Sequence, residues 1–267
     1  CDQGADGLDH DTVCGHAQGA SMTTVGVVQA RMGSGRLPGK VMLPLGDAPV
    51  IAYPITALGT VLDDVVVATT FHPRDDIIVQ AAEDRGVGVY RGSEDDVLGR
   101  IYRAGLEKDA DTLVRVTADN PFVGSRVVEA AVERMRQTDA EYLTTKRRRT
   151  LPVGVDVDTF DMSALGAAED RGRASRHREH VTPYLLEHHD RFEIADLTAA
   201  DVFGPDPPEA RPQLRLTLDE AADYAMYTQI AEVLGPRQEY ALADVIAAID
   251  DHGLAELNAG VDQRTGY

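Results

Sequence analysis

The chain has 267 residues and carries 45 acidic against 26 basic side chains, which gives a formal net charge of −19. This length permits one large or two small domains. The negative charge disfavours nucleic-acid binding, no apolar run approaches the roughly 20 residues of a membrane span, and a disulfide framework is excluded because the two cysteines, Cys1 and Cys14, lie close together at the start. We therefore expect neither a nucleic-acid nor a membrane partner.

Residues 1–21 differ in composition from the rest of the chain. They contain four Asp, no Lys or Arg and no apolar run. A signal peptide needs a basic start and an apolar middle, and both are missing here. We expect a disordered or vector-derived leader at 1–21, a single domain over 22–267 that begins at Met22, and a cytoplasmic location.

The acidity extends over the whole chain. Of the 26 basic residues only three are lysine, namely Lys40, Lys108 and Lys146. Abundant carboxylates with scarce lysine are typical of proteins from salt-loving organisms, in which a high net charge maintains solubility. The composition therefore predicts a halophilic protein.

Residues 29–40 (QARMGSGRLPGK) form the most informative stretch. They lie between two apolar runs, 25–28 and 41–45, the first of which has the length and β-branched content of a strand. Glycines allow the backbone to approach a ligand closely, and the cations Arg31, Arg36 and Lys40 suit a polyanion. The stretch predicts a triphosphate-binding loop; the alternative is an ordinary surface loop with solvated cations.

Two better-known glycine loops do not fit this stretch. A Walker loop would require Gly where Ser34 stands and a hydroxyl where Val41 stands, and the dinucleotide fingerprint would require Gly at Pro38. The phosphate-binding hypothesis therefore rests on the cations and not on either motif.

From residue 23 to residue 145, short β-branched runs alternate with helical patterns. This alternation predicts βαβ units and a mostly parallel sheet. In such sheets ligands bind at the carboxyl ends of the strands, and the cationic loop follows the first strand. The expected strands are 24–29, 65–69, 87–90, 112–116 and 142–145, and the expected helices are 49–59, 75–84, 95–108 and 124–136.

The segment 91–100 begins the third of these helices. Ser93 and Asp96 have the spacing of a helix-capping pair. The alternative is that Arg91 or Asp96 lines a nucleotide pocket.

Two aspartates stand where strands are expected to end. Asp119 follows the run 113–116 and precedes a proline turn, and Asp219 follows the run 214–218 and precedes a helix. Each has a structural alternative, an Asx turn for Asp119 and an N-cap for Asp219. Beside a triphosphate loop, the pair predicts a magnesium site, because Mg²⁺ takes one or two carboxylates together with phosphate oxygens.

From residue 146 onward the pattern changes. The basic run 146–149 is interpreted as a solvated turn or as a rim that attracts an anionic sugar. Residues 152–160 alternate like a strand, with Asp156 and Asp158 on one face. We expect residues 178–185 to lie on or to open a helix, and residues 221–250 to form two amphipathic helices. The histidines near 177–189 lack the companion ligands of a zinc site.

Four segments, taken together, resemble a known family. They are 29–40, 91–98 (RGSEDDVL), 178–184 (REHVTPY) and 215–219 (RLTLD). In this order they resemble the SpsF-type cytidylyltransferases, relatives of the CMP-sialic acid and CMP-Kdo synthetases that are associated with surface polysaccharide assembly. The likeness covers about residues 23–225. It departs at Gly35, where Thr is usual, and at 118–121 (ADNP), where GDCP is usual; neither departure removes a charged group.

The resemblance implies a Rossmann-like, GT-A-like nucleotidyltransferase fold with a mostly parallel sheet flanked by helices and a small substrate or dimerisation arm at about 146–200. It implies attack of a sugar-acid hydroxyl on the α-phosphate of CTP with Mg²⁺, release of pyrophosphate, and a homodimer. Arg31, Arg36 and Lys40 would act on the triphosphate, and Asp119 and Asp219 would bind the metal. The remaining implied nucleotide-binding residues are Gln29, Ala30, Met32, Gly33, Ser34, Arg91 and Asp96, and the implied sugar-binding residues are Asp156, Arg178, Glu179, His180 and Tyr184.

Three alternatives stay open from the sequence. The enzyme could use another nucleoside triphosphate or a neutral sugar, or the chain could be a non-catalytic paralogue that binds nucleotide or glycan. The two carboxylates and three cations favour an enzyme. No residue is assigned as a general base.

Overall fold

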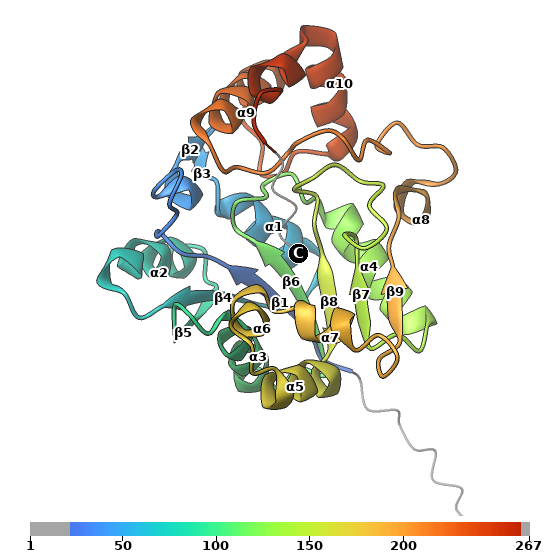
Figure 1. Ribbon diagram of the computed structural model, residues 1–267. Coiled ribbons are helices and arrows are strands. Elements are labelled where there is room, and N and C mark those ends of the chain that lie inside the picture. The colour runs from blue at the N-terminus through green and yellow to red at the C-terminus, as the bar shows by residue number, and fades with distance from the viewer. Residues whose placement is uncertain (1–21, 263–267) are drawn as a thin grey trace, which may run out of the picture.

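The computed structural model describes residues 22–262, so the expectation for the leader at 1–21 lies outside the described residues. A twisted seven-stranded sheet forms the centre of the molecule and helices cover both of its faces (Figure 1). The strand order is β5-β4-β1-β6-β8-β7-β9, and only β8 among these strands runs antiparallel to its neighbours. This confirms the predicted fold class. Among the described residues, no helix is both long enough and apolar enough to cross a bilayer.

The strands of the first half match the prediction closely. The sheet strands are β1 (Thr24–Gln29), β4 (Asp64–Thr70), β5 (Gly88–Gly92), β6 (Thr112–Thr117), β7 (Tyr142–Thr144), β8 (Asp158–Asp161) and β9 (Ile194–Asp196), and a separate ribbon pairs β2 (Pro44–Leu45) with β3 (Ala48–Pro49). Side chains of the central strands alternate between two apolar clusters, as Val27 and Val28 of β1 do. Because both faces are buried, these strands are nearly continuous apolar runs.

Helices from different parts of the chain cover each face. α1, α2 and α4 contribute to one apolar cluster, whereas α3, α5 and α7 contribute to the other. The C-terminal helices α9 and α10 lie at one end of the sheet (Figure 1). The helices are α1 (Ala52–Val61), α2 (Asp76–Glu83), α3 (Val97–Glu107), α4 (Ser125–Gln137), α5 (Met162–Arg171), α6 (Ser175–His180), α7 (Pro183–Glu187), α8 (Ala199–Phe203), α9 (Ala221–Leu234) and α10 (Leu242–His252), with 3-10 turns η1 (Lys40–Met42), η2 (Pro73–Asp75) and η3 (Leu254–Asn258).

The second half corrects two strand predictions. Of residues 152–160, only the last three belong to β8, which extends to Asp161. Residues 214–218 form no strand of the sheet; they make a single bridge between Val153 and Arg215. Gly154 permits this contact, since its φ is 98° and a Cβ would lie 2.1 Å from the Leu216 carbonyl oxygen.

The segment expected as an inserted arm, 146–200, is only partly separate from the main body. Its strands β8 and β9 belong to the main sheet, β8 between β6 and β7 and β9 at the edge. Its helices α5 and α7 pack on the same face as α3. The expectation that this segment forms a substrate or dimerisation arm stays a prediction.

Candidate active site

The cationic loop, residues 29–40, follows the carboxyl end of β1, and the buried Asp75 holds its backbone in place. Asp75 is fully buried, accepts the Met32 backbone N–H at 2.8 Å and accepts the Thr70 hydroxyl. The loop closes on itself where the Gly39 N–H donates to the Met32 carbonyl at 3.0 Å, with Gly39 at φ 72°. The loop that carries the three cations is therefore anchored at both ends.

Lys40 brings the two predicted carboxylates together. Its Nζ lies 2.5 Å from Asp119 Oδ2 and 2.8 Å from Asp219 Oδ1. Asp119 follows β6, and its backbone carbonyl accepts the Leu218 N–H at 3.0 Å, which aligns the segment that ends at Asp219. We call Lys40, Asp119 and Asp219 the Lys40 cluster. Its geometry agrees with the prediction that the two carboxylates meet beside the cationic loop.

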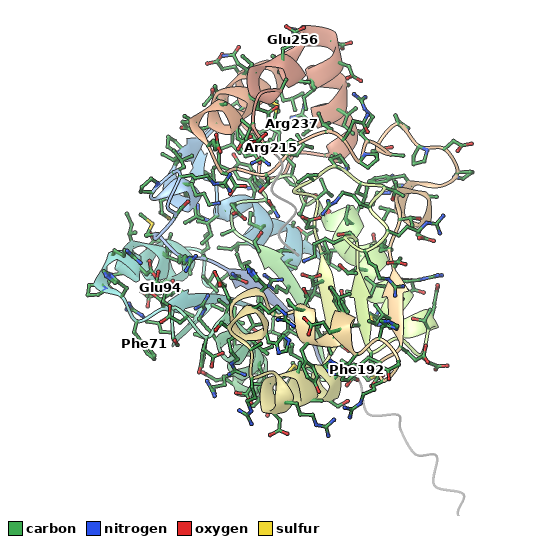
Figure 2. All side chains as sticks on the ribbon, in the orientation of Figure 1. Phe71, Glu94, Phe192, Arg215, Arg237 and Glu256 are labelled. Atoms are coloured by element: carbon green, nitrogen blue, oxygen red, sulfur yellow. The ribbon has the colours of Figure 1, made fainter. Side chains whose placement is uncertain are left out.

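Two arginines add charge around Asp219. Arg36 lies 3.1 Å from Asp219 Oδ2, and Arg215 lies 3.0 Å from the same oxygen. In Figure 2, Arg215 lies beneath the C-terminal helices, on the side that faces the sheet. Arg215 also pairs with Asp223 at 2.9 Å, and the fully buried Asp223 accepts the backbone N–H groups of Asp219 and Glu220. The helix N-cap is therefore Glu220, and the alternative that Asp219 caps α9 is wrong.

Lys40 and Asp219 each favour the charged form of the other. Burial disfavours the charged form of Lys40, but Asp119 and Asp219 outweigh it and raise the pKa of the ammonium above its ordinary value. Burial likewise opposes ionisation of Asp219, but Lys40 and Arg36 outweigh it and hold the pKa of the carboxyl below its usual value. One ammonium thus faces two carboxylates across a partly open site.

A pocket of about 410 Å³ opens over this cluster. It brings together most residues that the sequence assigned to the nucleotide and the metal. The lining residues are Gln29, Ala30, Arg31, Ser34, Gly35, Arg36, Lys40, Val41, Ala118, Asp119 and Asp219. Met32 and Gly33 do not line it, because Met32 packs against the apolar core and Gly33 sits against the side chains of Arg74 and Glu94.

A second pocket, of about 500 Å³, adjoins the first at Arg31, which lines both. In this pocket Arg178 NH2 lies 2.6 Å from Asp96 Oδ2. The two residues therefore meet, although we expected Arg178 to bind the sugar and Asp96 to bind the nucleotide. Asp96 is itself the N-cap of α3 and accepts the Gly99 N–H at 3.0 Å, whereas the predicted capping pair placed Ser93 at the start; Ser93 Oγ accepts the backbone N–H groups of Asp95 and Asp96 in the preceding turn. The full lining is Arg31, Glu94, Asp95, Asp96, Arg173, Ser175, Arg178 and Glu179.

Besides Met32 and Gly33, four more predicted site residues lie outside both pockets. Arg91 points to Asp76 at 2.7 Å and to backbone carbonyls, and Asp156 pairs with Arg149 at 2.9 Å. Tyr184 is buried and stacks on His188, so it supports the core instead of facing a ligand. His180, at the end of α6, is exposed outside these two pockets.

Sequence reasoning missed the residues that hold this site in place. Asp75 and Asp223 lie outside the segments that carried the resemblance, and Arg215 was noted only as part of the segment 215–219. Asp75 meets its partner Met32 from 43 residues away, and the pairing of Arg215 with Asp223 depends on how the chain turns between them. Arg115 did leave a signal, because a charge inside the apolar run 112–116 of a two-sided sheet requires a buried partner. Its partners are described below.

The Lys40 cluster has the chemistry of a divalent-metal site that is completed by its ligand. Carboxylate oxygens are the groups that Mg²⁺ prefers. Within residues 22–262, no group of three or more His, Cys, Asp or Glu side chains could hold a metal ion, so the protein offers two carboxylates at this place. These residues fit Mg²⁺ if phosphate oxygens supply the remaining ligands.

Comparison with known proteins adds independent information. The family model described as cytidylyltransferase matches residues 25–245. The uncharacterized protein MJ1063 of Methanocaldococcus jannaschii is 36% identical over 213 residues, covering 78% of this chain and 83% of that protein. The spore coat polysaccharide biosynthesis protein SpsF of Bacillus subtilis is 28% identical over 236 residues, covering 84% and 92%. The structure of a cytidylyltransferase from Leptospira borgpetersenii matches with a TM-score of 0.81 at 29% identity, covering 91% of this chain and 100% of that one.

Proposed function

The chain belongs to the cytidylyltransferase family, and from this membership we propose that it transfers CMP from CTP to a sugar acid and releases pyrophosphate, in the synthesis of a surface polysaccharide or another glycan. The observation that carries the proposal is the contact of Lys40 Nζ with both Asp119 and Asp219 at the mouth of the cationic loop. Cations for a triphosphate and carboxylates for a metal then meet in one pocket.

The reaction is a displacement at phosphorus. A sugar hydroxyl releases its proton to solvent and forms a bond to the α-phosphorus of CTP, while the bond to the bridging oxygen of the β-phosphate breaks and its electron pair leaves with pyrophosphate. Such a reaction depends on positioning and charge neutralisation more than on covalent help. Arg31, Arg36 and Lys40 would bind the phosphate chain and stabilise the charge that develops on the leaving group.

Asp119 and Asp219 would hold Mg²⁺. When bound, the ion supplies charge neutralisation of phosphate oxygens and a lowered pKa for a coordinated hydroxyl. In its absence the Lys40 ammonium balances part of the charge of the two carboxylates.

A sugar acid is the proposed acceptor because of the resemblance to CMP-sialic acid and CMP-Kdo synthetases. Arg31, Arg173 and Arg178 line the second pocket together with four carboxylates, and these arginines are the groups there that could bind an acid. A carboxylate-bearing sugar is suited to such groups. The homodimer is proposed on the same resemblance, and light scattering in solution would test it.

The proposal is tested by pyrophosphate release. The purified chain is incubated with Mg²⁺, CTP and a panel of acids that includes 3-deoxy-manno-octulosonate and N-acetylneuraminate, with neutral sugars as controls. Thermal shifts with CTP, UTP, GTP and ATP report the base preference, since a ligand at 100 times its Kd adds ~2.7 kcal/mol. We expect CTP to give the largest shift and an acid to be required for turnover. A larger shift with another nucleotide, or turnover only with neutral sugars, would change the assigned substrate; nucleotide binding without turnover on any sugar would indicate a non-catalytic paralogue.

A further inference from the structure

A buried row of polar groups crosses the sheet just beneath the first pocket. It runs from Gln29 at the end of β1, through Arg115 of β6, to Asp158 of β8. Arg115 donates to Gln29 Oε1 from Nε at 2.9 Å and from NH2 at 2.7 Å, and it donates to Asp158 Oδ2 from NH1 at 2.7 Å. The guanidinium is thus held at both ends.

The Asp158 carboxylate is held by several donors besides Arg115. It also accepts from Lys146 Nζ at 2.6 Å, from the Tyr142 hydroxyl at 2.8 Å and from the Thr144 hydroxyl at 2.9 Å. We call Arg115, Lys146 and Asp158 the Asp158 cluster. A buried carboxylate with this many donors fixes the rotamer of the arginine that it binds.

The row determines which way the Gln29 amide faces. Two guanidinium N–H groups point at one atom of the amide, and only the carbonyl oxygen can accept them. The amide nitrogen, Nε2, must therefore point away from Arg115. Nε2 forms no hydrogen bond with the residues the structure describes, and it is not among their enclosed unpaired atoms. Since Gln29 lines the first pocket, these two N–H donors are available to a ligand there.

Gln29 occupies a distinct place in that pocket. It pairs with Thr117, its backbone carbonyl accepts the Ala118 N–H at 2.9 Å, and Asp119 follows directly. Gln29 therefore lies at the carboxyl end of β1, next to the residues that lead from β6 into Asp119. Because the metal that Asp119 would hold must neutralise the phosphoryl group that reacts, we take the α-phosphoryl group as the part of the triphosphate that faces Gln29.

We propose that Gln29 donates from its amide nitrogen to a non-bridging oxygen of the α-phosphoryl group and that Arg115 is the positioning residue that fixes this donor. This inference rests on the proposed function. Gln29 neither gains nor loses a proton; it supplies an oriented, uncharged donor where negative charge is redistributed as the bond to the β-phosphate oxygen breaks. A fixed dipole of this kind needs no reorganisation during the reaction.

The decisive variant is Gln29→Glu. It keeps an oxygen for Arg115 and replaces the pocket-facing NH2 by a carboxylate oxygen. If Gln29 served only to satisfy Arg115, this variant would fold and bind nucleotide as well as the wild type, because it adds a salt bridge. We expect a melting temperature at or above that of the wild type and, by isothermal titration with Mg²⁺, a CTP affinity lower by about 100-fold, because a hydrogen bond to a charged group is replaced by repulsion.

A second pair of variants tests the orientation. Gln29→Met removes the donor without adding charge and should weaken CTP about tenfold. Arg115→Lys releases the amide from its bidentate contact and should weaken CTP by a similar factor, with no further loss when combined with Gln29→Met. Gln238→Glu, an exposed change of the same charge in a different pocket, is the matched control and should bind CTP like the wild type.

Phosphorus NMR of bound CTP identifies the group that is contacted. We expect the α-phosphorus resonance to differ between the wild type and Gln29→Met, while the β and γ resonances stay in place. Unchanged CTP affinity in Gln29→Glu, or a change confined to the β and γ resonances, would overturn the assignment. If the wild type prefers a different nucleotide, the choice of CTP fails, but the same comparison holds with that nucleotide because every nucleoside triphosphate carries an α-phosphate.

Discussion

The Lys40 cluster and the Asp158 cluster are opposite in composition. In the first, one ammonium lies between two carboxylates whose side chains are 22% and 21% exposed; in the second, one carboxylate that is 3% exposed lies between two cations. The first has an excess of negative charge and can accept a further cation. The second has an excess of positive charge and accepts the carbonyl oxygen of Gln29 instead. The comparison contrasts a charged cluster that we propose binds a ligand with one that holds a neighbouring side chain in place.

The largest expected effect comes from a substitution in the buried Asp158 cluster. Asp158→Asn leaves Arg115 and Lys146 buried without a counter-charge and should lower the free energy of unfolding by about 3–5 kcal/mol. Urea denaturation measures this loss. The control is Asp156→Asn, two residues away, whose pair with Arg149 is partly exposed and should change stability by at most about 1 kcal/mol. Equal losses in the two variants would contradict the distinction.

The next effect is on the open cluster. Asp219→Asn removes one of the two carboxylates that we propose hold the metal. Arg36 is partly exposed to water and the buried Arg215 keeps its pair with Asp223, so we expect folding to persist and turnover to fall roughly 10²–10³-fold. Pyrophosphate release and Mn²⁺ binding in the presence of CTP measure the two consequences. Asp250→Asn, which removes a surface charge paired with Arg211, is the control. Normal turnover in a folded Asp219→Asn protein would refute the metal assignment.

A smaller effect follows from the position of Lys40 between the carboxylates. Lys40→Met removes the ammonium that competes with a metal ion for Asp119 and Asp219. Mn²⁺ should then bind the nucleotide-free protein about tenfold more tightly, which corresponds to ~1.4 kcal/mol, while CTP binds more weakly. Paramagnetic resonance of free Mn²⁺ gives the first value. Weaker Mn²⁺ binding in this variant would show that Lys40 does not compete.

The pH dependence of the free energy of unfolding tests the Asp158 cluster at acidic pH. Burial opposes ionisation of Asp158, but Lys146 and Arg115 outweigh it and hold the pKa of its carboxyl below the ordinary value of 3.8. The folded state therefore binds this proton less readily than the unfolded state. The stabilisation is complete above that ordinary value and is lost as the pH falls through the folded pKa. Urea midpoints at about pH 6 and about pH 3 should differ less in Asp158→Asn than in the wild type.

The smallest effect is that of salt on the whole molecule. A net charge of −19 should destabilise the folded state by self-repulsion, which salt screens. We expect the folded fraction, measured by circular dichroism, to rise between low and molar KCl. A constant folded fraction would contradict the halophilic prediction.

Elements that depend on local sequence were predicted well, whereas contacts between distant segments were predicted less well. The strands of the first half were predicted almost to the residue because each is a β-branched run between turn residues. Asp119 was expected beside the cationic loop because the carboxyl ends of the parallel strands β1 and β6 lie at the same edge of the sheet, whereas Asp219 was expected there as the end of a strand that residues 214–218 do not form. Residues 214–218 were mistaken for a strand, since their apolar side chains are buried in the core without backbone pairing to the sheet. Asp158 was assigned to the same face as Asp156, because the alternation of residue types along the chain does not reveal that Arg115 and Lys146 pair with Asp158.

The contact at Gly154 has a consequence for how the pocket can vary. Asp119 lies in the turn that follows β6 of the sheet, whereas Asp219 follows the segment 214–218, which packs against Gly154 where a side chain would have no room. The separation of the two carboxylates therefore depends on a close backbone contact at Gly154, a residue that belongs to neither pocket. A substitution of Gly154 is expected to displace the segment 214–218 and, with it, Asp219.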